Sequence, residues 1–172
     1  MKKEISDLNN FLMLATEVLK TTQKDSREVL KYVYSDGEQL IVTDGHILIT
    51  LYQITESVTP GFYNISKVGK ELVLIPSNFE GNYPDYTRVI PKYAFKALKI
   101  NFTKTEYMEN LIKLQDIALK HCGGYVAEEH FELLKKSEFI YQVFTPWRCE
   151  HLQPVIFEAN ALTIVVMPKP IK

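Results

Sequence analysis

The sequence predicts an α+β fold made of two half-modules, each consisting of a helix and antiparallel strands. An amphipathic helical pattern opens the chain, short strand-like segments separated by turn residues follow it, and the same order recurs in the second half. The 172 residues, 46% hydrophobic and 24% charged, suffice for one domain with a substantial core. We therefore expect a single domain over residues 1–172, with half-modules 1–91 and 92–172.

The first half-module is expected to begin with a helix over residues 6–22, because apolar side chains recur there every three or four positions. Strands are then expected over residues 29–34, 39–43, 46–54, 62–65 and 71–75. Turns at Ser35-Asp36-Gly37 and Asp44-Gly45 make the first three strands a meander. Prolines near both ends of residues 83–91 indicate an extended connector.

The second half-module is expected to follow a packed linker over residues 92–102. Thr103 and Glu106 have the spacing of a capping box, which predicts a helix that ends at Gly123-Gly124. A shorter helix should follow over residues 127–136. The closing strands are expected over residues 139–144, 154–158 and 162–167, the last two joined by a turn at Asn160.

No group of residues predicts catalysis. Asp44 and His46 adjoin in a turn, but no nucleophile motif, phosphate-binding glycine loop or carboxylate cluster accompanies them. The pairs His121-Cys122 and Cys149-Glu150-His151 lack the spacing of a zinc knuckle, so we expect both cysteines to be small buried apolar residues. We therefore predict a protein that is not an enzyme, with no catalytic residues, no metal and no cofactor.

The charge and hydropathy of the chain limit its partners and its location. Twenty Lys and Arg against 21 Asp and Glu give a net charge of -1, which excludes a polycation and makes any nucleic-acid contact regional. No run of about 18 apolar residues occurs, and the first residues do not resemble a signal peptide. We expect a soluble, cytoplasmic protein with no membrane partner.

Three segments, taken together and in this order, resemble a known family. They are Val42-Thr43-Asp44-Gly45-His46-Ile47-Leu48, Phe79-Glu80-Gly81-Asn82-Tyr83-Pro84-Asp85-Tyr86-Thr87-Arg88-Val89-Ile90-Pro91 and Ile164-Val165-Val166-Met167-Pro168. They are similar to the bacterial DNA sliding clamp, the β subunit of DNA polymerase III, which carries Ala-Thr-Asp-Gly-His-Arg-Leu, Phe-Pro-Asp-Tyr-Arg-Arg-Val-Leu-Pro and a C-terminal Val-Val-Met-Pro-Met-Arg-Leu. A full clamp chain is longer and has three domains. The resemblance therefore implies a shortened, single-domain-sized protein with a DNA-clamp-like fold.

The resemblance also implies a hydrophobic cleft that receives short linear peptides. Val89, Val165 and Met167 would supply apolar contacts, and Gly45 would allow close approach of a peptide backbone. Ile47 replaces the family's arginine and so removes a donor from the rim, which predicts binding that depends less on salt than in a typical clamp. Carried over position by position, the cleft residues are Thr43, Gly45, His46, Ile47, Leu48, Pro84, Arg88, Val89, Val165, Val166, Met167 and Pro168.

Contact with double-stranded DNA is the second implication, because clamp helices surround the duplex and need basic side chains for its phosphates. Residues 92–120 carry six Lys against three acidic side chains, whereas residues 1–28 are neutral and residues 127–136 are acidic. The expected DNA-contacting residues are Lys104, Lys113 and Lys120.

The leading hypothesis is a processivity-factor-like accessory protein of DNA replication or repair that binds clamp-binding-motif peptides of polymerase or repair proteins. Because the family's rings contain six domains, a one-domain chain would need six copies to close an equivalent ring. The alternative is a clamp-mimicking regulator, encoded by a phage or mobile element, that binds clamp partners or the clamp without encircling DNA. Double-stranded DNA and a second copy of the chain, in a homo-oligomer, are the further partners expected, and DNA is encircled only under the first hypothesis.

Overall fold

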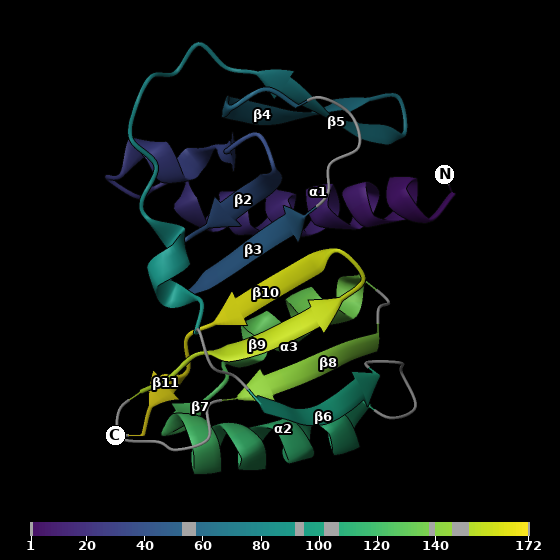
Figure 1. Cartoon of the computed structure of the whole chain (residues 1–172), viewed down its shortest axis with the longest axis vertical. Coiled ribbons are helices and arrows are strands. Elements are labelled where there is room, and N and C mark those ends of the chain that lie inside the picture. Colours follow the sequence, from purple (N-terminus) through teal and green to yellow (C-terminus); the bar gives the residue numbers. More distant parts are fainter. Residues whose placement is uncertain are drawn as a thin grey trace. The chain divides into compact units, whose positions relative to one another are not determined.

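The structure is a computed structural model that describes residues 2–52, 58–91, 95–101, 107–137, 140–145 and 152–171, excepting the side chains of 2–6, 95–98, 101, 107 and 140. The chain forms two compact units (Figure 1). Unit 1 comprises Met1–Asp85 with Asn160–Thr163, and unit 2 comprises Tyr86–Ala159 with Ile164–Lys172. Helices and antiparallel strands build both units, which confirms the predicted α+β class. That both halves form a single domain stays a prediction.

Unit 1 is an antiparallel sheet with one long helix packed on strands β2 and β3. Its elements are α1 (Lys2–Thr22), the 3-10 helix η1 (Glu28–Lys31), β1 (Val33–Ser35), β2 (Gln39–Thr43), β3 (Ile47–Tyr52), β4 (Gly61–Val68) and β5 (Glu71–Pro76). The strand order is β5-β4-β1-β2-β3, so the predicted meander β1-β2-β3 is confirmed. In the β2–β3 hairpin Val42 lies opposite Ile49 and Thr43 opposite Leu48.

Unit 2 combines a second antiparallel sheet with two helices. Its elements are the 3-10 helix η2 (Tyr86–Val89), β6 (Phe95–Asn101), α2 (Tyr107–Cys122), β7 (Gly124–Tyr125), α3 (Glu128–Lys136), β8 (Ile140–Thr145), β9 (Val155–Ala159), β10 (Leu162–Val166) and β11 (Lys169–Pro170). The main sheet has the order β10-β9-β8-β6, and β7 pairs with β11. Phe131, Tyr141 and Phe157 are fully buried and form the centre of its core.

The turn between β9 and β10 belongs to unit 1 and lies next to the first turns of helix α1. The Asn160 amide donates a hydrogen bond to the Asp7 carboxylate at 3.1 Å, and the Tyr52 N–H donates to the Ala161 carbonyl at 2.9 Å. Asn160 has a φ of 53°, in the left-handed region that Asn tolerates better than most residues. The turn predicted at Asn160 is therefore confirmed, and it completes unit 1.

Three predicted segments differ from the structure. Residues 28–31 form η1 and place Leu30 in the core. The strand expected over residues 29–34 therefore begins only at Val33, as β1 (Val33–Ser35). The expected linker contains strand β6, which pairs with β8 through a register shift between Lys96 and Leu98 that breaks the alternation a strand normally shows. The expected extended connector contains η2, because its prolines flank the 3-10 turn rather than interrupting it. The capping box Thr103–Glu106 lies outside the described residues.

Gly124 permits the close pairing of β7 with β11 at the end of the chain. A Cβ added to Gly124 would lie 2.4 Å from the Lys169 carbonyl oxygen and 2.9 Å from a methyl group of Leu152. Real Cβ atoms do not approach backbone this closely, so only glycine fits here. The ion pair between Lys169 Nζ and Glu129, at 2.8 Å, provides a second attachment of β11 to this unit.

We predict that Gly124→Ala separates β11 from β7 and lowers the free energy of unfolding by about 1–3 kcal/mol, the usual cost of overpacking a tight contact. Hydrogen exchange at the paired residues Tyr125 and Lys169 should accelerate, which mass spectrometry of the exchanged protein measures. Unchanged exchange in the variant would show that the close approach is not required.

Candidate functional site

The turn between β2 and β3 is held by its own side chains. Thr43 Oγ1 donates a hydrogen bond to the Ile47 carbonyl at 2.6 Å and accepts one from the Gly45 N–H at 3.0 Å. Asp44 Oδ1 accepts hydrogen bonds from the N–H groups of His46 and Ile47, at 2.8 Å and 2.9 Å. Gly45 has a φ of 94°, which favours glycine. The Thr-Asp-Gly-His sequence therefore specifies the shape of the turn.

Side chains from the end of α1 and the following loop attach this turn to the rest of unit 1. The single proton of Thr21 Oγ1 is shared between the Val18 carbonyl at 2.7 Å and Asp44 Oδ2 at 3.1 Å. Arg27 Nη2 donates to the Asp44 carbonyl at 3.4 Å. Arg27 is itself positioned by Asp25, whose carboxylate accepts from Nε at 3.0 Å and from Nη2 at 2.7 Å. The hydrogen bonds from Arg27 lower the pKa of the Asp25 carboxyl to about 2.

Gly45 and His46, at the tip of the turn, are open to solvent, whereas the residues that follow them at the start of β3 are buried. Gly45 and His46 are exposed and Thr43 is half-buried, whereas Ile47 and Leu48 are 2% and 3% exposed. The Ile47 side chain lies in the core at the start of β3, so it can support the turn but offers little surface to a ligand. That its replacement of the family's arginine weakens the salt dependence of binding stays a prediction.

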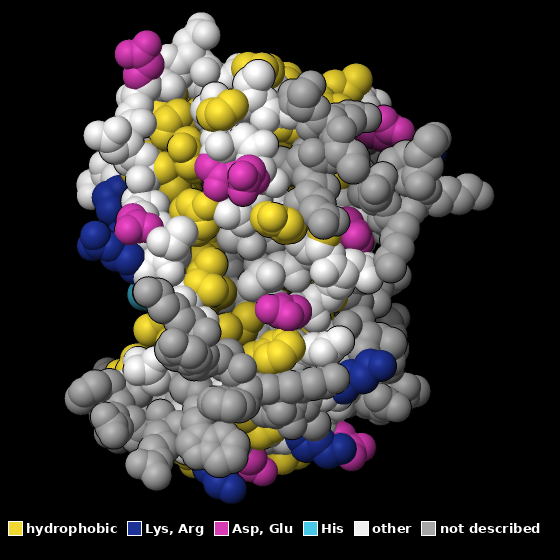
Figure 2. All heavy atoms as spheres, viewed as in Figure 1, with side chains coloured by type: hydrophobic (Ala, Val, Ile, Leu, Met, Phe, Trp, Pro, Cys, Tyr) yellow, Lys and Arg dark blue, Asp and Glu magenta, His cyan; other side chains and the backbone are white. Residues whose placement is uncertain are grey.

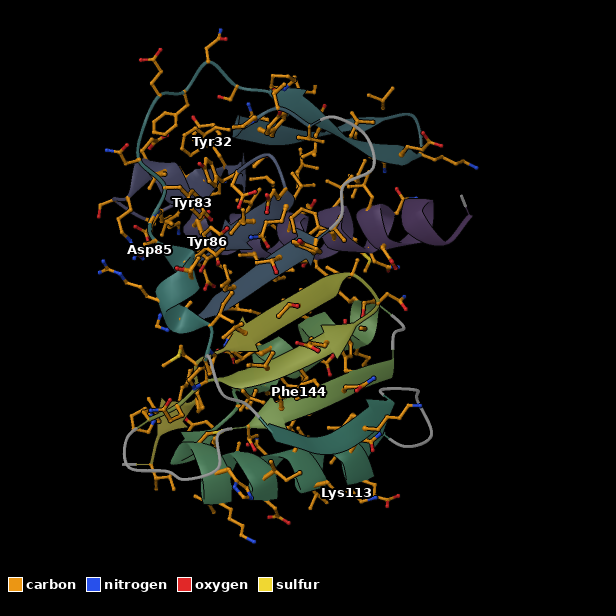
Figure 3. The ribbon with its side chains drawn as sticks, viewed as in Figure 1. Tyr32, Tyr83, Asp85, Tyr86, Lys113 and Phe144 are labelled. Carbon is orange, nitrogen blue, oxygen red and sulfur yellow. The ribbon has the colours of Figure 1, made fainter. Side chains whose placement is uncertain are left out.

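An aromatic cluster, which the sequence reasoning did not identify, packs beside this turn in unit 1. Phe62 lies at its centre, in edge-on or tilted contact with Tyr32, Tyr34, Phe79 and Tyr83. Tyr34 stacks on Tyr83 with ring centroids 4.8 Å apart, and Tyr32 stacks on Phe79 at 4.7 Å. Figure 3 labels one member of each pair, Tyr83 and Tyr32. Phe62 lies opposite Tyr34 in the β1–β4 pairing, a register that period-two alternation alone did not reveal. Figure 2 shows that hydrophobic side chains reach the surface of this unit.

Tyr83 connects the second family-like segment to the first. Its hydroxyl is buried beside the backbone of Thr43, and burial raises the pKa of the Tyr83 phenol well above its ordinary value. The contact does not reach the geometry of a regular hydrogen bond, so the hydroxyl has no partner among the described residues. The first part of the second segment thus lies beside the first segment in unit 1, whereas the rest of the second segment, from Tyr86 onward, belongs to unit 2.

The other predicted cleft residues fall into exposed and buried groups. Pro84 and Arg88 are exposed, as is Val89 in η2, with 43% of its surface accessible. In the third segment Val165, Val166 and Pro168 are buried, and Met167 is half-buried. The exposed members can touch a ligand directly, whereas the buried members can act only by supporting them. That all three segments form one cleft stays a prediction.

Helix α2, which carries two of the three predicted DNA-contacting lysines, lacks the surplus of lysines counted over residues 92–120. Lys113 and Lys120 are exposed on α2, and Lys113 forms an ion pair with Glu109. Within α2 these two lysines are balanced by Glu109 and Asp116, because the other four lysines of residues 92–120 precede the helix in sequence. Lys104 lies outside the described residues.

The residues considered for a metal site do not assemble one in the described part of the chain. Cys122 is buried, with its sulfur 3.9 Å from the Pro154 carbonyl oxygen, as expected for a small core residue. Cys149 and His151 lie outside the described residues. No three His, Cys, Asp or Glu side chains within the described ranges are grouped so that they could hold a metal ion.

Solved structures show what this fold is similar to, although no family model and no curated protein matches the sequence. The sliding clamp (DNA polymerase III subunit beta) of Bartonella birtlesii matches with a TM-score of 0.56 and 14% identity over 96% of this chain and 64% of that chain. The β subunit of Borrelia burgdorferi matches with a TM-score of 0.59 and 13% identity, over 95% and 63%. The β clamp of Helicobacter pylori bound to a DNA ligase peptide matches with 0.55 and 13%, over 94% and 63%.

The chain therefore has the fold of the bacterial sliding clamps over nearly its whole length. It spans slightly less than two thirds of the length of the clamps it matches. The resemblance inferred from residues is confirmed at the level of the fold.

We predict that Arg27→Gln raises the pKa of Asp25 from about 2 toward its ordinary value of 3.8. Since folding lowers this pKa, the carboxylate stabilises the wild type above about pH 3.8, and that contribution is lost as pH falls toward 2. The variant should therefore show less acid destabilisation in this window. Carboxyl NMR titration measures the pKa, and Lys24→Gln, which removes an exposed neighbouring cation, is the matched control. An unchanged Asp25 pKa in the Arg27 variant would contradict the assigned cause.

Proposed function

We propose that this protein is a sliding-clamp-like accessory factor of DNA replication or repair that binds clamp-binding-motif peptides. The observation that carries the proposal is the packing of Tyr83, in the first part of the second family-like segment, beside Thr43 of the first, while Gly45 and His46 remain exposed. The clamp fold supports it, since the H. pylori clamp of the same fold is bound to a DNA ligase peptide. The proposal includes no catalytic activity and a cytoplasmic location.

The chemistry of the exposed residues suits an extended peptide with Leu and Phe anchors. Gly45 presents no side chain and permits close approach of another backbone. Val89 offers an exposed apolar surface, and the flexible thioether of Met167 can adapt to different anchor side chains. Ile47, Leu48 and Val165 would support these groups from the core. We propose that the three segments bind one peptide together.

We predict that Val89→Asp and Met167→Asp each weaken binding of a fluorescent peptide with Leu and Phe anchors by about 1–3 kcal/mol, as expected for losing a buried apolar contact. Fluorescence anisotropy titration measures the dissociation constants. Val68→Asp is the matched control, because Val68 is also an exposed valine, with 62% of its surface accessible, but lies outside the proposed site. Circular dichroism verifies that each variant is folded.

Two results would contradict the peptide-binding proposal. The first is a wild type that does not bind the peptide at all. The second is equal weakening by Val68→Asp and by the two site variants, which would indicate a nonspecific effect of charge rather than loss of an anchor contact. In either case only the fold similarity would remain.

Contact with duplex DNA is a separate proposal, carried by Lys104, Lys113 and Lys120. We predict that replacing all three with Glu abolishes duplex binding and its dependence on salt, because fewer phosphates are neutralised. Electrophoretic or anisotropy titration at several salt concentrations measures this effect. A wild type that binds the peptide but no duplex at low salt would exclude the encircling ring and favour the clamp-mimicking regulator.

A further inference from the structure

The outward face of α2 has an apolar stripe that no described part of the chain covers. Met108, Ile112 and Leu119 are 63%, 59% and 51% exposed. On an ideal helix with about 100° between successive residues, these three side chains fall within a sector about 40° wide. The opposite side of α2 buries Leu114 and Ala118 in unit 2. The stripe therefore lies on a different side of α2 from the residues that pack into unit 2.

Two rows of charge run beside this stripe. Glu109 and Asp116 form an acidic row next to the apolar side chains, and Lys113 and Lys120 form a basic row beyond it. The two rows cancel each other. Phosphate recognition requires an excess of positive charge, whereas large apolar side chains flanked by balanced charge are typical of a protein contact.

The order of these charges along α2 makes the face complementary to itself. From Glu109 to Lys120 the signs alternate as negative, positive, negative, positive. When two such helices pack antiparallel about a midpoint between residues 114 and 115, Glu109 of one copy faces Lys120 of the other, and Lys113 faces Asp116. All four pairs have opposite signs, and Met108 comes to lie near Leu119 of the second copy.

We propose that α2 is a self-association surface on which a second copy of this chain docks through its own α2, antiparallel and about a two-fold axis. Such an isologous contact uses the same patch on both copies, which the reversed charge order allows. The ion pair between Lys113 and Glu109 within one copy is exposed and contributes little, so its charges can exchange partners across the interface. The proposal is independent of peptide binding, and it is an alternative to duplex contact through Lys113 and Lys120, because a second copy docked on α2 would engage both lysines.

The charge order provides a specific test. Lys113→Glu with Lys120→Glu makes the face wholly acidic, and Glu109→Lys with Asp116→Lys makes it wholly basic. Each double variant should lose self-association, because like charges then oppose one another, whereas an equimolar mixture of the two should form a heterodimer. Light scattering coupled to size-exclusion chromatography measures the mass of each sample as a function of concentration.

The apolar stripe is tested by Ile112→Glu, which should weaken wild-type self-association about tenfold or more. Val68→Glu, at a similarly exposed site in unit 1, is the matched control and should leave the mass unchanged. A wild type that is monomeric at all concentrations would overturn the proposal. So would an oligomer that persists in both the Ile112 and the all-acidic variants, since another surface would then be responsible. Peptide binding by the same variants, measured separately, shows whether the proposed function survives either result.

Discussion

The carboxylate of Asp44 makes the hydrogen bonds on which the candidate site depends. One of its oxygens accepts from two backbone N–H groups inside the β2–β3 turn, and the other accepts from the hydroxyl of Thr21 at the end of α1. A turn whose donors are satisfied locally can leave Gly45 and His46 exposed without leaving buried backbone groups unpaired. The turn is thus held by hydrogen bonds and accessible at its tip, two properties that suit the peptide-binding surface proposed above.

Local patterns of sequence predicted much of this arrangement. The hairpin was predictable because its strands alternate around a turn whose residues have a specific role, and β2 was placed over the residues it occupies. The shape of the turn likewise follows from Thr43, Asp44 and Gly45. Features that depend on contacts distant in sequence were not predictable. The aromatic cluster brings together side chains from β1, β4 and the segment after β5, and no local period records their proximity.

Strand β6 and the charge of α2 show two other limits of sequence reasoning. A register shift in β6 interrupts the alternation of apolar and polar residues by which a strand is recognised. The sequence pattern of these residues therefore predicted a linker where the structure has a strand. The count of lysines over residues 92–120 combined strand β6, helix α2 and residues outside the described ranges, and the surplus did not belong to the helix that was expected to carry it. A net charge becomes informative only when assigned to a surface, because neighbouring charges of opposite sign screen one another.

The hydrogen bond between Asp7 and Asn160 joins residues 153 positions apart within unit 1. Unit 1 is therefore discontinuous in sequence, because its first 85 residues are completed by four residues near the other end of the chain. During synthesis the helix and five strands of this unit emerge well before the turn that completes them. Closing so long a loop carries an entropic cost that local contacts do not, and folds rich in such contacts form slowly. The last step in folding unit 1 must therefore await the β9–β10 hairpin, and until then the edge of β3 near Tyr52 lacks its hydrogen-bond partner.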